Sequence, residues 1–353
     1  HPAQNRSIRP RLPMTYSPAM QLSDAFALAA RQIALGQHFL LAAHAHLDGD
    51  ALGSMLVTAH GLRLLGKDVF LYSPFPVPRR LRFLPGVEWV KRHVPSSLRF
   101  SATLVHDCSA RSLLGDAFPS PEVTGPLIVL DHHEIVSDFG DIVVRDSSAG
   151  SVGVVSLGVL SSSGLTESAL PYELALALFV SLVEDTGWFR YSSANAEVFR
   201  LAQLAVSRGV DPWQVSLKLD EQLSEASLRL RTLVLPTLER HLDGRLALLT
   251  LTDEHLRAAH ATPDDVGQLV QYARALAGVE IGAQITQSDA RIYVSLRGKG
   301  CVHVGLIAQT FGGGGHRNAA GCTIPLPENT DPQTAVQTAK ARLIAACAPP
   351  LSA

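Results

Sequence analysis

Short apolar segments that alternate with helical segments constrain the fold of this chain more than any other feature. Buried strands are predicted where a short run is almost wholly apolar, over 39–43, 69–72, 103–105 and 127–130. Helices are predicted before, between and after these runs, over 23–36, 51–65, 151–160, 172–183 and 196–208. This alternation favours the α/β class, with a mostly parallel sheet and helices on both faces.

The second half of the chain repeats this pattern on a smaller scale. A helix over 302–310 precedes a run of glycines, and strands are predicted over 245–251, 279–284 and 291–296. A break at 209–212 and a long helical run that ends at Pro236 separate the two halves. The chain has 353 residues, which suits two domains. We therefore predict a first α/β domain over 20–210, a helical linker over 211–235, and a smaller α/β domain over 236–350 with a cleft between the two.

Composition limits the partners and the compartment. Lys and Arg number 30 against 32 Asp and Glu, a net charge of -2, whereas proteins that grip long nucleic acids usually carry a basic excess. Any nucleic-acid partner is therefore expected to be short. No apolar run reaches the roughly 18 residues of a membrane span, so no membrane association is expected. The cysteines lack C-x-x-C spacing, which favours a reducing, cytoplasmic setting without disulfides or structural zinc: Cys108, Cys301, Cys322 and Cys347.

Histidine and aspartate gather where the predicted strands end. The first strand runs into His44-Ala45-His46-Leu47-Asp48-Gly49-Asp50, the third into His106-Asp107 and the fourth into Asp131-His132-His133. A later helix ends in Glu184-Asp185. A lone histidine at a strand end is more often a hydrogen-bonded loop residue, but several clusters at equivalent strand ends favour a metal site. Imidazole and carboxylate without thiolate suit Mn²⁺, Fe²⁺ or Zn²⁺, and the number of ligands is enough for two ions.

A second group of candidate residues follows the last predicted strand. Consecutive glycines can turn backbone N–H groups inward to bind an anion, so Gly313, Gly314 and Gly315 are predicted to recognise phosphate with His316 and Asn318. No Lys-Ser/Thr pair follows, so this run is not a Walker A loop. Arg297 could pair a phosphate bidentately, and Arg190 is a weaker candidate. Other histidines are expected to be surface or packing residues: His60, His93, His241, His255, His260 and His303.

Taken in order, these motifs resemble those of the DHH phosphoesterase superfamily. The resemblance is carried by His44-x-x-x-Asp48-x-Asp50, Asp107, the Asp131-His132-His133 triplet and Asp185-Thr186-Gly187, while 312–321 is similar to the signature of the DHHA1 substrate domain. It spans roughly 23–347, and the two-domain layout looks most like the nanoRNase and pAp phosphatases of the NrnA type. The resemblance implies a cytoplasmic hydrolase that degrades RNA of two to five nucleotides and dephosphorylates 3′-phosphoadenosine 5′-phosphate (pAp).

The resemblance also assigns roles, position by position. Two Mn²⁺ ions per chain would be held, one by His44, Asp48 and Asp107 and the other by Asp50, Asp107, His132 and Asp185, so that Asp107 bridges them. Asp107, Asp131 and His133 would be catalytic: His133 would face the phosphate, and Asp131 would orient a ligand imidazole. The sequence departs from the family pattern at His46, Leu47 and Glu184.

The implied reaction is in-line attack on phosphorus by a hydroxide activated between the two ions. Within the superfamily, a cyclic dinucleotide or pApA phosphodiesterase stays open as an alternative. A RecJ-like single-strand exonuclease is disfavoured by length, and an inorganic pyrophosphatase by the glycine-rich run. A non-catalytic RNA-binding regulator would have no reason to keep the complete ligand set. The assembly, for which a homodimer is one candidate, is left open.

Overall fold

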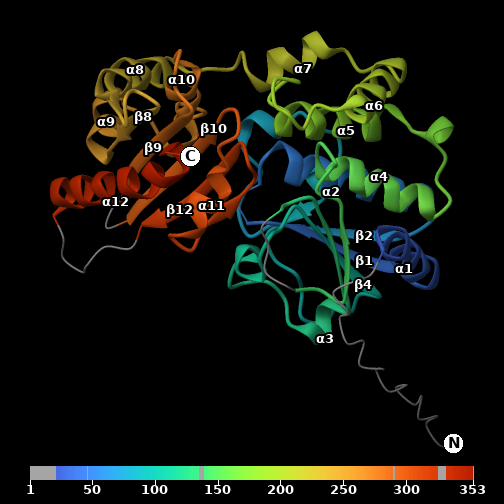
Figure 1. Ribbon diagram of the computed structural model, residues 1–353. Helices are drawn as coiled ribbons and strands as arrows, with labels where there is room; N and C mark the ends of the chain where they lie inside the picture. Colours follow the sequence, from blue (N-terminus) through green and yellow to red (C-terminus); the bar gives the residue numbers. More distant parts are fainter. Residues whose placement is uncertain (1–20, 46, 135–138, 289–290, 325–330, 353) are drawn as a thin grey trace, which may run out of the picture.

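A computed structural model describes residues 21–45, 47–134, 139–288, 291–324 and 331–352, which form two domains, each built on its own sheet (Figure 1). The first domain carries a six-stranded, wholly parallel sheet, and the second a six-stranded mixed sheet. The predicted α/β class is confirmed. None of the helices in the described ranges is long and apolar enough to cross a bilayer. All four cysteines are free.

The first sheet has the strand order β3-β2-β1-β4-β5-β6. Its strands are β1 (His38–Ala43), β2 (Asp68–Tyr72), β3 (Val90–Lys91), β4 (Ala102–His106), β5 (Leu127–Asp131) and β6 (Ile142–Arg145). Alternate side chains enter different cores: Phe39 and Leu41 of β1 pack on one face, Leu40 and Ala42 on the other. Both faces are therefore covered, which is why these strands are continuous apolar runs.

Long helices cover one face of this sheet, and short segments cover the other. α2, which follows β1, is buried along almost its whole length and packs against both the sheet and α5 (Figure 1). The opposite face is closed by short turns and by α3 (Pro121–Thr124). The remaining helices of this half are α1 (Leu22–Leu35), α2 (Gly49–Leu64), α4 (Val152–Ser162), α5 (Tyr172–Asp185) and α6 (Ala196–Ser207). The segment predicted as a helical linker contains α7 (Pro212–Leu219) and α8 (Glu225–Val234), begun by the N-caps Asp211 and Ser224.

The second sheet runs in the order β11-β12-β10-β9-β8-β7, and only β8 and β9 are parallel. Its strands are β7 (Glu239–His241), β8 (Leu246–Leu251), β9 (Ile281–Ser288), β10 (Arg291–Gly298), β11 (Gly314–Gly315) and β12 (Ala319–Ile324). Helices pack on both faces: α8, α9 (Asp253–Ala259) and α10 (Val270–Ala275) on one, and α11 (Val304–Gln309) and α12 (Pro332–Ser352) on the other. The predicted smaller α/β domain is confirmed, and its sheet is mixed because β9 and β10 form an antiparallel pair.

Candidate active site

The site begins at the point where the strand order of the parallel sheet reverses. β1 and β4 are neighbours, but the chain leaves them toward opposite edges of the sheet, and ligands in such sheets bind beyond the carboxyl ends at this point. β1 is followed by His44 and then by Asp48, the N-cap of α2, whose carboxylate accepts the Ala51 N–H at 2.9 Å. β4 is followed directly by Asp107. The fold thus brings together residues that are about sixty positions apart.

Asp107 lies at the centre of a first group with His44 and Asp48. His44 Nε2 is 3.5 Å from Asp107 Oδ2 and 3.9 Å from Asp48 Oδ1. Asp107 has a φ of 49°, a left-handed conformation uncommon for a residue with a Cβ. Burial opposes charge on His44, yet the nearby Asp107, Asp48 and Asp50 raise its pKa to about 9. In the absence of a metal ion, a proton would therefore bind where these ligands converge.

Asp50, His132 and Asp185 form a second group. His132 Nε2 is 3.2 Å from Asp185 Oδ2 and 3.7 Å from Asp50 Oδ2. Its Nδ1 lies 2.9 Å from the carbonyl oxygen of Ala149, and because a carbonyl only accepts, Nδ1 carries a hydrogen. Nε2 is buried with no hydrogen-bond partner among the described residues. An imidazole nitrogen beside two carboxylates provides the nitrogen and oxygen ligands that divalent transition metals bind, so this donor set fits a divalent metal.

Asp50 also ties this group to the core. Its carboxylate accepts the N–H of Val152 at 2.8 Å, at the start of α4, and the Ser181 hydroxyl at 2.6 Å. Burial, followed by Asp107 and Asp185, raises the pKa of Asp50 well above its usual range. Burial is also the largest influence on Asp185 and raises its pKa to about 6. Three carboxylates are thus crowded into one buried space, an arrangement that bound cations would relieve.

Asp131 and His133 lie next to Asp107 of the first group. Asp131 Oδ1 accepts His133 Nδ1 at 2.7 Å, and His133 Nδ1 is 3.6 Å from Asp107 Oδ1. Asp131 therefore orients His133, while the ligand candidate His132 is held by the Ala149 carbonyl. His316 of the second domain stacks on His133 with ring centroids 4.1 Å apart, and lies 4.4 Å from the His132 ring. Burial and the two neighbouring histidines lower the pKa of His316, which favours the neutral ring.

The glycine-rich run forms a tight hairpin, in which some of the backbone amides are already bonded to carbonyl groups. Gly314 and Gly315 pair with β12, while the amides of Gly312, Gly313 and His316 donate to backbone carbonyls. Those three amides are unavailable to an anion. The glycines instead allow close approach: a Cβ on Gly313 would lie 2.2 Å from the Gly321 carbonyl oxygen. The hairpin thereby carries the side chains of His316 and Asn318 to the first domain, where Asn318 Nδ2 donates to Ser192 Oγ at 2.7 Å.

Residues from both domains line one cavity of about 1540 Å³. It is bounded by both metal-ligand groups and by Arg297, whose Nε is buried without a hydrogen-bond partner among the described residues. Arg190 does not line it, since its Nε donates to the Gly187 carbonyl at 2.6 Å. His106 is absent from the lining as well: its ring bonds Thr58 Oγ1 and the Ala42 carbonyl in the core, and burial lowers its pKa to about 4. His46 lies outside the described residues.

Three features of the cavity were not found from the sequence. Arg80 pairs bidentately with Glu184, at 2.8 and 2.5 Å, which gives the unassigned Glu184 a role. Tyr191 reaches the second domain, where the Arg274 guanidinium lies 4.9 Å from its ring centroid. His303, expected to be a background residue, contacts Glu134 across the domains at 2.8 Å. Arg80 lies in a proline-rich loop, and no pattern in the sequence signals these contacts.

A parallel sheet with histidine and aspartate at its carboxyl edge, followed by a DHHA1 domain, defines the class of DHH/DHHA1 phosphoesterases. The DHHA1 domain family matches residues 248–344. A bifunctional oligoribonuclease and PAP phosphatase NrnA of Thermus thermophilus is 31% identical over 284 residues, covering 80% of this chain and 83% of the relative. The protein of the same name from Bacillus subtilis is 24% identical, covering 83% of this chain and 91% of its own. The chain therefore belongs to the NrnA family.

The likeness extends to a solved structure. An exopolyphosphatase-related protein from Bacteroides fragilis superposes with a TM-score of 0.82 at 24% sequence identity. The match covers 94% of this chain and 98% of that protein. At this level of identity the likeness supports the fold, including the order of the two domains.

Proposed function

We propose that this protein is a metal-dependent phosphoesterase that hydrolyses short oligoribonucleotides to mononucleotides and pAp to AMP. The observation that carries the proposal is the second ligand group, in which His132 Nε2 faces two carboxylates with no hydrogen-bond partner among the described residues. The names of the NrnA relatives support the substrate class.

Two Mn²⁺ ions are the proposed cofactors. His44, Asp48 and Asp107 would hold one ion, and Asp50, Asp107, His132 and Asp185 the other. Asp107 Oδ1 is buried without a hydrogen-bond partner among the described residues, which suits a carboxylate that bridges two ions. Bound metal ions would supply an activated water and a clamp on the phosphoryl oxygens.

The other residues would orient the substrate. Burial is the largest influence on His133, but the bond to Asp131 and the nearby Asp107 outweigh it and raise the pKa of His133. The protonated ring can then donate its remaining N–H to a phosphate oxygen of the substrate. Arg297 lies in the wall of the same cavity and can pair a second phosphate. His316 and Asn318 bring the second domain against the site, so a substrate would be enclosed by both domains. Enclosure of this kind favours short or terminal substrates.

The central test is the change Asp107→Ala, assayed by Mn²⁺-dependent release of mononucleotides from a 5′-labelled dinucleotide. Activity should fall by at least about a thousandfold, and bound Mn²⁺ per chain, measured by mass spectrometry, should decrease. Asp68→Ala is the matched control, because that carboxylate is exposed and contacts His38 and Gln37 at the start of the sheet, away from the candidate ligands. Retained activity in Asp107→Ala would exclude the two-metal proposal.

A substrate panel separates the proposal from its alternatives. RNAs from dinucleotide to pentanucleotide, pAp and cyclic di-AMP are compared with Mn²⁺ present. Preference for cyclic di-AMP or pApA would move the function to a dinucleotide phosphodiesterase. Metal-free protein with no activity on any of them would favour an RNA-binding module. Arg297→Ala should raise KM for nucleotides and leave hydrolysis of a small artificial phosphodiester nearly intact.

A further inference from the structure

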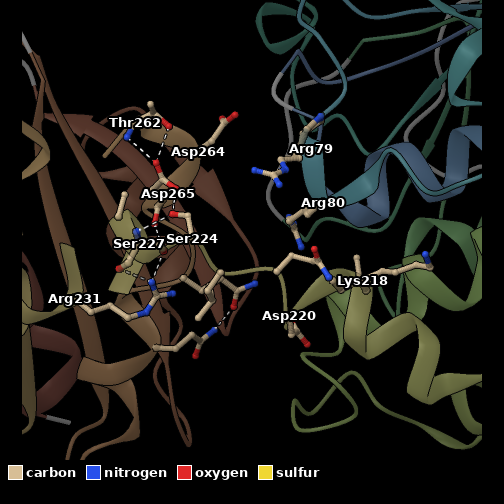
Figure 2. A pocket seen from close by; sticks show the side chains of 18 of the residues that line it. Arg79, Arg80, Lys218, Asp220, Ser224, Ser227, Arg231, Thr262, Asp264 and Asp265 are labelled. Atoms are coloured by element: carbon tan, nitrogen blue, oxygen red, sulfur yellow. Dashed lines mark hydrogen bonds between the residues drawn. The ribbon is translucent and has the colours of Figure 1, made fainter. Parts of the chain in front are cut away.

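A second cavity of about 1010 Å³ lies beside the proposed active site, between the two domains. Its walls come from the loop around Arg79, from the segment joining the domains, and from the second domain (Figure 2). Small-molecule pockets typically measure roughly 300–1,000 Å³, so this space is large enough for a substantial ligand.

The two cavities meet at shared residues. Arg80 and Gln268 line both of them. Arg80 is held by Glu184, which directly precedes the metal-ligand candidate Asp185. An extended ligand that leaves the proposed active site past Arg80 would therefore enter the second cavity directly.

Cations and aromatic rings beyond Arg80 suit a nucleic-acid strand. Arg79 is exposed, and its guanidinium donates no hydrogen bond within the described ranges. Lys218 of α7 is also exposed, and its Nζ lies 5.7 Å from the ring centroid of Phe83. Tyr272, with 47% of its surface exposed, lines the same cavity. Single-stranded nucleic acids are bound by this combination of cations along the backbone and rings under the bases.

Two acidic residues occupy the opposite wall, and a third, Asp220, lies near Lys218 and Arg80. Figure 2 shows Arg79 and Arg80 on one side of the gap and Asp264 and Asp265 on the other. The Asp265 carboxylate is already engaged within its own domain, where it accepts the Ser224 hydroxyl at 2.5 Å and the Thr262 N–H at 2.8 Å. Phosphates would therefore follow the wall formed by Arg79 and Lys218.

We infer that this second cavity binds the distal nucleotides of an oligonucleotide whose terminal phosphodiester lies in the active site. The inference rests on the proposed function and adds to it a binding site for substrates longer than a dinucleotide. A dinucleotide fills the active site alone, whereas a pentanucleotide extends past Arg80 and contacts Arg79 and Lys218.

The experiment compares kcat/KM for a pentanucleotide with kcat/KM for a dinucleotide in the full-length protein with Mn²⁺. The double variant Arg79→Ala/Lys218→Ala should lower this ratio about three- to thirtyfold, with dinucleotide hydrolysis unchanged within about twofold. Its salt dependence for the pentanucleotide should weaken by about 0.7 in the log–log slope for each phosphate that the variant no longer neutralises. Asp264→Asn, which removes a charge from the opposite wall, should raise the ratio.

The matched control is Arg31→Ala/Arg257→Ala, which removes two exposed cations that line neither cavity. An unchanged ratio in Arg79→Ala/Lys218→Ala would overturn the inference, and so would an equal loss on both substrates. Failure of the proposed function is distinguishable, because the wild-type protein would then release no mononucleotide from the dinucleotide either.

Discussion

At the scale of single residues, the ion pair between Arg80 and Glu184 joins the proline-rich loop to the active site. The Glu184 side chain is only 9% exposed, and Gly49 leaves it room, since a Cβ there would lie 2.1 Å from Glu184 Cγ. Arg80→Met should destabilise the protein by about 1–3 kcal/mol, because it leaves a nearly buried carboxylate unpaired. Urea unfolding measures this change, with Arg82→Met as the control at an exposed neighbour that bonds only a backbone carbonyl.

The double variant Arg80→Met/Glu184→Gln tests the same pair. It should be more stable than the sum of the two single changes implies, since each single change leaves a partner unpaired. Strict additivity of the unfolding free energies would show that the two side chains are not coupled.

The histidines of the metal-ligand groups predict an unusual pH dependence for the metal-free protein. The pKa values of His44 and His132 are raised to about 9 against 6.5 in the unfolded chain, as nearby carboxylates outweigh burial, the largest influence. Their contribution to stability is complete below pH 6.5 and is lost as the pH rises through 9. Thermal unfolding in chelator should therefore show Tm falling between pH 6.5 and 9.

Saturating Mn²⁺ should remove this fall, because a bound metal replaces the protons and stabilises the folded state. Asp185→Asn should lose most of the Mn²⁺-dependent rise in Tm, whereas Asp68→Asn should keep it. A metal-free Tm that stays constant or rises across this pH range would contradict the assignment of the two histidines.

Most of the candidate ligands could be predicted from the sequence because they come after strands, and parallel strands present their carboxyl ends at one edge, whereas Asp185 ends the helix α5. Their hydrogen-bond partners could not. Asp131 bonds to His133, whereas the neighbouring His132 bonds to the carbonyl of Ala149, eighteen residues after Asp131 in the chain. The sequence does not show where that carbonyl lies. Arg80 and His303 were missed for the same reason, since their contacts depend on how distant loops meet.

At the scale of elements, apolar strands of the parallel sheet were predicted well, because both of their faces are buried. β12 was not predicted from the sequence, since Ala319-Ala320-Gly321 is small and contains glycine. It is a strand because β10 pairs with it along its whole length, so tertiary pairing outweighs weak local preference. The short β7 and α9 were also missed.

The glycine hairpin of β11 and β12 offers a matched pair of substitutions. Gly313→Ala would place a Cβ 2.2 Å from the Gly321 carbonyl oxygen, whereas a Cβ on Gly314 meets no atom within 4 Å. Gly313→Ala should destabilise the protein by about 1–3 kcal/mol and raise KM, because the hairpin that carries His316 must shift. Gly314→Ala should leave both nearly unchanged. Equal effects of the two substitutions, measured by urea unfolding and dinucleotide kinetics, would contradict this role of the hairpin.

At the scale of the whole molecule, several contacts join the domains around the proposed active site, and three of them concern us most. Glu134 meets His303, Ser192 meets Asn318, and His133 stacks on His316. All three lie on the side of the metal-ligand groups, while the second cavity lies toward the segment that joins the domains. The domains are thus closed at the proposed active site, and closure there would exclude water from the reacting phosphate.

Weakening these contacts should open the cleft without unfolding either domain. Glu134→Gln combined with Ser192→Ala weakens the contact with His303 and removes the hydrogen bond with Asn318, and neither side chain is a proposed metal ligand. The radius of gyration from small-angle X-ray scattering should increase, and KM for the dinucleotide should rise about two- to tenfold. Glu225→Gln, which breaks an exposed pair with Arg229 inside α8, is the control and should change neither value. If the double variant keeps the wild-type radius of gyration and KM, these contacts do not hold the domains together, and closure must depend on the substrate itself.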